Sequence, residues 1–79
     1  MEELIQNKLE FAVLIDSDNI SSKYASTIFD ELEKYGFASC RRIYGNWSKG
    51  NGWSEKVLLE YSITPIQQFS YTYGKNATD

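Results

Sequence analysis

The sequence predicts a three-layer α/β/α fold in which helices cover a parallel β-sheet. Residues 11–15 form an uninterrupted apolar run of the kind found in strands of parallel sheets. Strand-like and helix-like segments then alternate along the chain in the order β–α–β–α–β. Because crossovers between parallel strands are right-handed, a chain that winds in one direction places its three strands in the order 3-2-1.

The composition is that of a packed domain and excludes several other classes of protein. The chain has 79 residues, of which 42% are hydrophobic and 15% aromatic. With 5 Gly, 1 Pro, 1 Cys and no His, it is neither a collagen nor a disulfide scaffold, and it lacks a Cys–His pair. The longest apolar run is far below the ~20 residues of a membrane helix, so we expect no membrane association. An acidic N-terminus and the unpaired Cys40 predict a cytoplasmic protein.

Charge is unevenly distributed along the chain. The formal net charge is −3, but residues 1–35 carry 8 acids and 3 Lys, whereas residues 36–79 carry 3 acids and 5 Lys or Arg. The stretch 41–56 contains four basic residues against Glu55 alone. This pattern fits either a local basic surface that binds nucleic acid or an ordinary solvated face.

The first strand and first helix have clear boundaries in the sequence. We expect residues 9–15 to form a strand buried on both faces, which ends at the polar residues 16–19. Ser21 or Ser22 can cap the helix that follows, and Gly36 stands where a helix C′ glycine is expected. The predicted core-facing stripe of this helix consists of Ile20, Tyr24, Ile28, Leu32 and Tyr35.

The second half of the chain repeats this order of elements. Residues 37–47 are rich in β-favouring residues and predict the second strand, and a glycine-rich loop covers residues 45–52. Residues 53–61 predict a short helix. Pro65 marks the start of a third strand over residues 66–73, and residues 74–79 predict a loop that leads into another helix.

Carboxylates follow the strands at the edge where ligands bind to open α/β sheets. Asp16 and Asp18 come directly after the first strand, and Asp79 follows the third. Carboxylates that converge there repel one another unless a cation such as Mg²⁺ or Mn²⁺ neutralises them. The alternative is that Asp16 and Asp18 shape a turn and that Asp79 favours a helix dipole. Lys75 and Asn76 stand at the start of the same predicted helix, where they can hold a phosphate; the alternative is a capped turn with a solvent-facing Lys75. Trp47 and Lys49 can stack on and neutralise a single nucleic-acid strand; the alternative is that Trp47 covers the core.

Three segments of the chain resemble the NYN domain, a branch of the PIN-like ribonuclease superfamily. Residues 11–20 (FAVLIDSDNI) are similar to its opening, and residues 44–48 (YGNWS) and 74–79 (GKNATD) are similar to the next two motifs of its bacterial LabA/limkain-type members. The resemblance implies a Rossmannoid, PIN-like parallel sheet and a Mg²⁺-dependent hydrolase that acts on RNA. By position, Asp16 and Asp79 match metal-binding acids, Asn19 matches the supporting polar residue, and Asp18 lies beside it as an outer-sphere helper.

The family's pattern continues beyond the last of these motifs. We therefore expect residues 1–79 to be the N-terminal part of a single domain, truncated after Asp79 and inactive alone, in which a second copy or a partner segment completes the sheet. Two other functions stay open. A strand that ends in Asp-x-Asp also resembles haloacid-dehalogenase-like phosphatases, with Asp16 as nucleophile and Asp18 as general acid, and the chain can also be an RNA-binding or interaction module without turnover.

Overall fold

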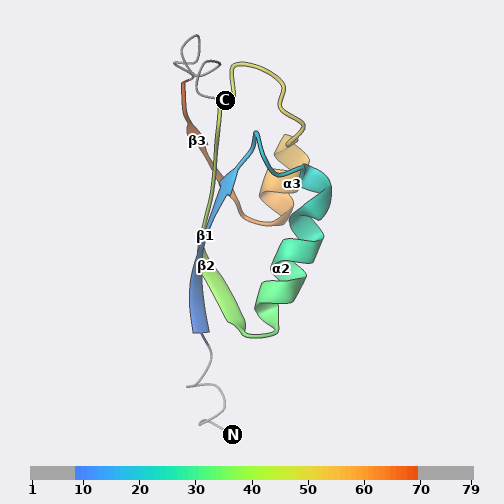
Figure 1. Cartoon of the computed structure of the whole chain (residues 1–79), viewed down its shortest axis with the longest axis vertical. Coiled ribbons are helices and arrows are strands. Elements are labelled where there is room, and N and C mark those ends of the chain that lie inside the picture. Colours follow the sequence, from blue (N-terminus) through green and yellow to red (C-terminus); the bar gives the residue numbers. More distant parts are fainter. Residues whose placement is uncertain (1–8, 70–79) are drawn as a thin grey trace, which may run out of the picture.

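The computed structural model describes residues 9–69 and shows a three-stranded parallel sheet with helices packed on it. The strand order is β1-β2-β3, which is the predicted 3-2-1 order seen from the other edge. The α/β class and the parallel sheet are therefore confirmed (Figure 1). The elements are β1 (Leu9–Asp16), the 3₁₀ turn η1 (Ser22–Tyr24), α2 (Ala25–Glu33), β2 (Gly36–Gly45), α3 (Glu55–Glu60) and β3 (Thr64–Gln67).

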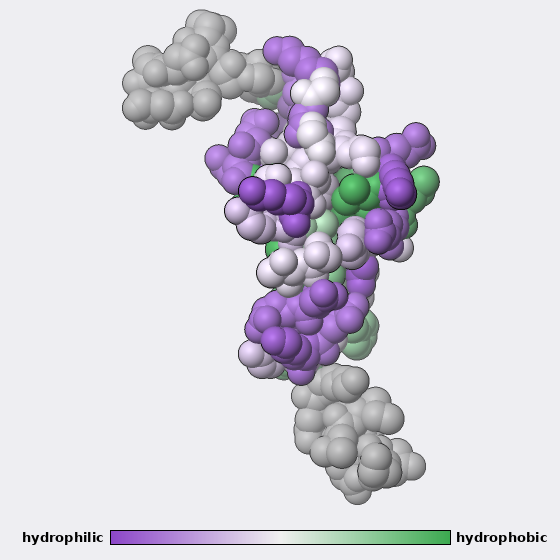
Figure 2. All heavy atoms as spheres, turned by 90° about the vertical axis from the view of Figure 1, so that its right-hand side faces the viewer, coloured by the Kyte–Doolittle hydropathy of each residue, from purple (hydrophilic) through white to green (hydrophobic). Residues whose placement is uncertain are grey.

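Both α-helices of the described residues lie on the same side of the sheet (Figure 1). Two successive right-handed crossovers that move in the same direction along a sheet must place their helices on one face. Residues 9–69 thus form two of the three predicted layers, namely the sheet and one layer of helices. The outward surface of this layer is mostly hydrophilic, as expected for amphipathic helices (Figure 2).

The prediction that β1 is buried on both faces is wrong for the described residues. Burial alternates along the strand: the side chain of Ile15 is 5% exposed, whereas that of Leu14 is 62% exposed. Successive side chains of a strand point to opposite faces, and the helices cover only the face that carries Ile15. An apolar run shows that a strand is hydrophobic, but the tertiary structure decides which of its faces is covered.

The first helix begins later than predicted, and a different stripe faces the core. Ser21 does act as a cap, since its Oγ accepts a hydrogen bond from the Lys23 N–H at 3.3 Å, but this cap opens η1, and α2 starts at Ala25. Ala25 and Phe29 are buried, and both lie one position beyond members of the predicted stripe. Of that stripe, Ile28 and Leu32 are half-buried, while Ile20, Tyr24 and Tyr35 are exposed. Spacings of three and four residues fit adjacent helical stripes equally well, so periodicity alone does not choose between them.

Gly36 opens β2 and is not the predicted left-handed C′ residue. A Cβ at this position would lie 1.9 Å from the backbone oxygen of Leu9. Leu9 and Gly36 are register partners at the start of the β1–β2 ladder. A glycine is therefore needed here for the close approach of two backbones.

The second crossover follows the sequence closely up to β3. The Ser54 Oγ caps α3 by accepting a hydrogen bond from the Val57 N–H at 3.2 Å. β2 ends at Gly45, two residues before the predicted end, and β3 begins at Thr64 and ends at Gln67, so the predicted strand over residues 66–73 is placed too late. Residues 70–73 of that prediction lie outside the described residues. Pro65 is tolerated because, within the described sheet, β3 pairs on one side only.

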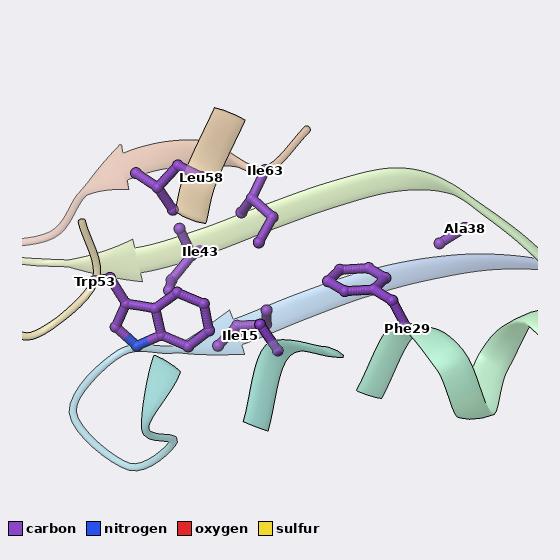
Figure 3. Close-up of a cluster of buried hydrophobic side chains, with 8 residues drawn as sticks. Ile15, Phe29, Ala38, Ile43, Trp53, Leu58 and Ile63 are labelled. Atoms are coloured by element: carbon purple, nitrogen blue, oxygen red, sulfur yellow. The ribbon is translucent and has the colours of Figure 1, made fainter. Parts of the chain in front are cut away.

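The core lies between the sheet and its helices, with Ile43 of β2 at its centre. Ile43 is the largest fully buried side chain of the described residues. It shares one cluster of buried side chains with Ile15 of β1, Ala25 and Phe29 of α2, Ala38 of β2, Leu58 of α3, and Trp53 and Ile63, which precede α3 and β3 (Figure 3). No helix of the described residues is both long and apolar enough to span a membrane.

Arg41 ties this core to the end of α3. Its guanidinium lies over the ring of Phe29 with 4.6 Å between Cζ and the ring centroid, and Phe29 in turn stacks on Tyr61. The Arg41 Nε donates a hydrogen bond to the Ala38 carbonyl at 2.9 Å, and Nη1 donates one to the Tyr61 carbonyl at 2.6 Å. Arg41 is thus a structural cation, whereas its neighbour Arg42 is exposed.

Candidate functional site

The turn after β1 holds the carboxylate of Asp16 in a fixed orientation. Its Oδ1 accepts a hydrogen bond from the Asp18 N–H at 3.1 Å, and its Oδ2 accepts one from the Asn19 Nδ2 at 2.7 Å. The backbone carbonyl of Asp16 also accepts hydrogen bonds from the N–H groups of Asn19 and Ile20, both at 3.1 Å. The carboxylate therefore shapes the turn, and it remains exposed at the carboxyl end of the sheet.

This turn brings together three of the predicted site residues. Asp16, Asp18 and Asn19 are all exposed and lie within four consecutive positions. A carboxylate has about four lone-pair positions, and the two hydrogen bonds to Asp16 occupy two of them. Oxygen donors on a rigid strand end suit Mg²⁺, which is commonly held through one or two carboxylates. The donor set of the turn therefore fits a hard divalent cation.

The structure describes only two of the remaining predicted site residues. Trp47 and Lys49 lie in the loop between β2 and α3, while Lys75, Asn76 and Asp79 lie outside the described residues. Within residues 9–69, no group of three or more Asp, Glu, His or Cys side chains is arranged to hold a metal ion. Asp16 and Asp18 are thus the acids that the described part of the chain contributes to the predicted metal site.

Tyr44 and Arg42 lie on the strand next to Asp16. Tyr44 is the register partner of Asp16, so the two side chains share a face of the sheet. Arg42 lies two residues before Tyr44 on the same strand and therefore on the same face. The hydrogen bond between the side chains of Arg42 and Tyr44 raises the pKa of Arg42 above its ordinary value. A guanidinium stays protonated in proteins in any case, so Arg42 adds a positive charge to the face of the sheet that carries Asp16, where it favours the approach of an anionic ligand.

Hydrogen bonds hold the loop between β2 and α3 at both of its ends. At its start, the Gln67 side chain accepts a hydrogen bond from the Trp47 N–H at 2.9 Å and donates one to the Asn46 Oδ1 at 2.9 Å. At its end, the Ser22 Oγ donates a hydrogen bond to the Gly52 carbonyl at 2.9 Å. The Trp53 Nε1 donates another to the Ile20 carbonyl, also at 2.9 Å. The loop is therefore attached directly to the segment that follows Asp16.

Sequence reasoning missed Ser17 and Asn51, which meet beside Gly45. Ser17 is 6% exposed, and neither its Oγ nor the Nδ2 of Asn51 has a hydrogen-bond partner within the described residues. A Cβ on Gly45 would lie 2.1 Å from the Ser17 Oγ and 3.3 Å from the Asn51 Nδ2. In the sequence, Gly45 stands where the predicted second strand and the glycine-rich loop overlap; its contact with Ser17 is long-range and leaves no local pattern.

We expect Gly45→Ala to destabilise the fold by about 1–3 kcal/mol, the usual cost of overpacking a tight interior site. The new methyl group would overlap the hydroxyl of Ser17, which is buried and cannot move away freely. Urea unfolding measures the effect. In a Ser17→Gly background the same substitution should cost less, because the obstructing side chain is gone. An equal cost in both backgrounds would show that this contact is not the cause.

Comparison with protein families identifies the fold. The family model of the NYN domain matches residues 10–79, which is nearly the whole chain. Searches of curated proteins and of solved structures gave no match. The matched range includes the strand, the Asp16 turn and the parallel sheet described above. The chain therefore belongs to the NYN domain family, whose members have a PIN-like, nuclease-related fold and generally act on RNA.

Proposed function

We propose that this protein is a metal-dependent ribonuclease that hydrolyses RNA phosphodiester bonds, with Asp16 as its first metal-binding carboxylate. The observation that carries the proposal is the exposed Asp16 carboxylate, fixed by two hydrogen bonds at the carboxyl end of β1. Ligands of open parallel sheets bind at that edge. The family match supports the nuclease class and favours it over the phosphatase alternative.

Each residue of the proposed site has a distinct role. Asp16 and Asp79 would hold Mg²⁺ or Mn²⁺, with Asp18 as an outer-sphere contact. Asn19 orients Asp16 through its hydrogen bond to Oδ2. Lys75, Asn76, Lys49 and Trp47 would contact the RNA. When bound, the metal supplies charge neutralisation and activation of a water molecule.

The proposal is tested by metal binding and RNA hydrolysis measured together. In ¹H–¹⁵N spectra, Mn²⁺ should broaden the backbone signals of residues 16–19 before those of other described residues, because a paramagnetic ion acts on its nearest nuclei. Labelled single-stranded RNA should be cleaved with Mg²⁺ or Mn²⁺ and not with EDTA. RNA binding without cleavage at any metal concentration would instead support the non-catalytic module. A phosphoaspartate trapped on Asp16 would support the phosphatase.

We expect Asn19→Ala to weaken Mn²⁺ binding by about 10–100-fold, the usual cost of removing a group that orients a metal ligand. The substitution removes the 2.7 Å hydrogen bond to Asp16 Oδ2 and leaves both acids of the turn in place. Titration of the Mn²⁺-induced broadening measures the change. Ser26→Ala, at an exposed position of α2, is the control and should leave the affinity unchanged. Equal Mn²⁺ affinities for Asn19→Ala and the control would show that Asn19 does not support the metal site.

A further inference from the structure

The loop between β2 and α3 forms an open hollow that is separate from the turn holding Asp16, Asp18 and Asn19. Its volume is about 410 Å³. The hollow is lined by Trp47, Lys49, Gly50, Asn51, Gly52, Trp53 and Ser54. Both tryptophans of the chain therefore lie in the wall of one cavity.

The two indole rings are held rigidly by hydrogen bonds from their ring nitrogens. The Trp47 Nε1 donates to the Ile66 carbonyl at 3.0 Å, and the Trp53 Nε1 donates to the Ile20 carbonyl at 2.9 Å. Trp53 is 5% exposed and belongs to the core, while Trp47 is half-buried: it packs against the core and retains some accessible surface. Trp47 thus offers a preorganised aromatic surface to a ligand, with little further entropy to lose on binding.

The remaining wall of the hollow suits an anionic ligand that carries a flat ring. Lys49 is exposed and brings a positive charge to the rim. Gly50 adds no side chain, and a Cβ built on it meets no atom within 4 Å, so the entrance beside it is open. Aromatic and basic groups together are what single-stranded nucleic acid binds, through base stacking and phosphate contact.

The hollow also lies close to the proposed metal site. Trp53 and Gly52 contact Ile20 and Ser22, which follow the Asp16 turn, and Figure 1 shows the loop beside the connection from β1 to α2. A strand whose base entered the hollow would therefore place a neighbouring phosphate near the carboxyl end of β1.

We propose that this hollow binds one unpaired nucleobase of the RNA, stacked on Trp47, with Lys49 on an adjacent phosphate. The proposal rests on the proposed function and adds the substrate class: the RNA is single-stranded at the point of contact. Stacking is available to every base, so binding tolerates different base sequences. Duplex RNA is disfavoured, since its bases are not free to enter.

Tryptophan fluorescence tests the hollow directly, since both indoles of the chain line it. In EDTA, hexauridylate or hexaadenylate should quench the emission as it binds. An abasic ribose-phosphate oligomer of equal charge should not quench it, and a 20-base-pair RNA duplex should bind at least about 10-fold more weakly than the hexamers. Equal quenching by the abasic oligomer, or equal affinity for the duplex, would overturn the proposal.

Narrowing the entrance of the hollow provides the second arm of the experiment. Gly50→Leu should weaken hexamer binding by about 5- to 150-fold, the range for one stacked base, because Gly50 lines the hollow beside its entrance. The melting temperature should stay unchanged, because a Cβ at this position meets no atom within 4 Å. Ser26→Leu adds the same side chain to an exposed position of α2 and should leave binding unchanged. Lys49→Ala should weaken binding more than the charge-matched Lys56→Ala, which lies on α3 outside the hollow.

The outcomes separate this proposal from the proposed function. Hexamer binding that is equal for Gly50→Leu and the wild type would overturn the nucleobase site, even where RNA is cleaved and Mn²⁺ binds at Asp16. Failure to bind Mn²⁺ or to cleave RNA would count against the proposed metal site and not against the hollow, because the fluorescence measurements are made without metal.

Discussion

Replacing Asp16 with asparagine is expected to weaken Mn²⁺ or Mg²⁺ binding by at least about 100-fold and to abolish RNA cleavage. Loss of a group that merely orients a metal ligand costs about 10–100-fold in affinity, so loss of a ligand's charge should cost no less. The substitution is nearly isosteric, and the amide keeps an oxygen that can accept the hydrogen bond from the Asp18 N–H. The amide nitrogen, however, replaces the oxygen that accepts the hydrogen bond from the Asn19 Nδ2, so this second bond is lost with the charge. The Asn19→Ala variant, which removes the same bond and keeps the charge, measures that share of the effect.

The matched control for this substitution is Asp30→Asn. Asp30 is an exposed acid on α2, away from the carboxyl end of the sheet, so its replacement changes the net charge equally. Mn²⁺ titrations, RNA cleavage and thermal melts should be compared for the two variants. Cleavage that persists in Asp16→Asn, or an equal loss in Asp30→Asn, would contradict the assignment of Asp16 as a metal ligand.

Ile43→Ala should have the largest effect on stability, about 2–5 kcal/mol, which is typical of truncating a buried aliphatic side chain. Ile43 is 0% exposed and lies on the central strand, between its register partners Ile15 on β1 and Pro65 on β3. A loss of that size is a large share of the roughly 5–15 kcal/mol that stabilises a typical domain. The melting temperature should fall by about 8–40 °C, or the cooperative transition should disappear.

Leu59→Ala provides the comparison for Ile43→Ala within the same domain. Leu59 is 73% exposed on α3, so the truncation removes little buried surface, and alanine is a good helix former. Its effect should stay within about 0.5 kcal/mol. Urea unfolding of both variants measures the difference, and similar losses for the two would show that Ile43 is not the centre of the core.

The sequence predicts the polar turn after β1 better than it predicts the packing. Asp16, Asp18 and Asn19 lie within four residues, so their arrangement depends on one local turn, and turn preferences are readable from residue type. Helical spacing leaves neighbouring stripes equivalent, so the sequence predicts a stripe one position before the buried residues of α2. The sequence also places Gly36 at a helix end, because its contact with Leu9 is made across the whole first crossover and leaves no local pattern.

The α/β class, the parallel strand order and the polar turn after β1 can be read from the residues. The class and the turn follow from local hydrophobic runs and turn residues, and the strand order follows from the fixed handedness of crossovers, which holds for any β–α–β unit. Which face of β1 is covered, and how the loop after β2 is held to the segment after Asp16, depend instead on tertiary contacts. The bonds that fasten this loop join residues about thirty positions apart, so they exist only once the helices have packed on the sheet.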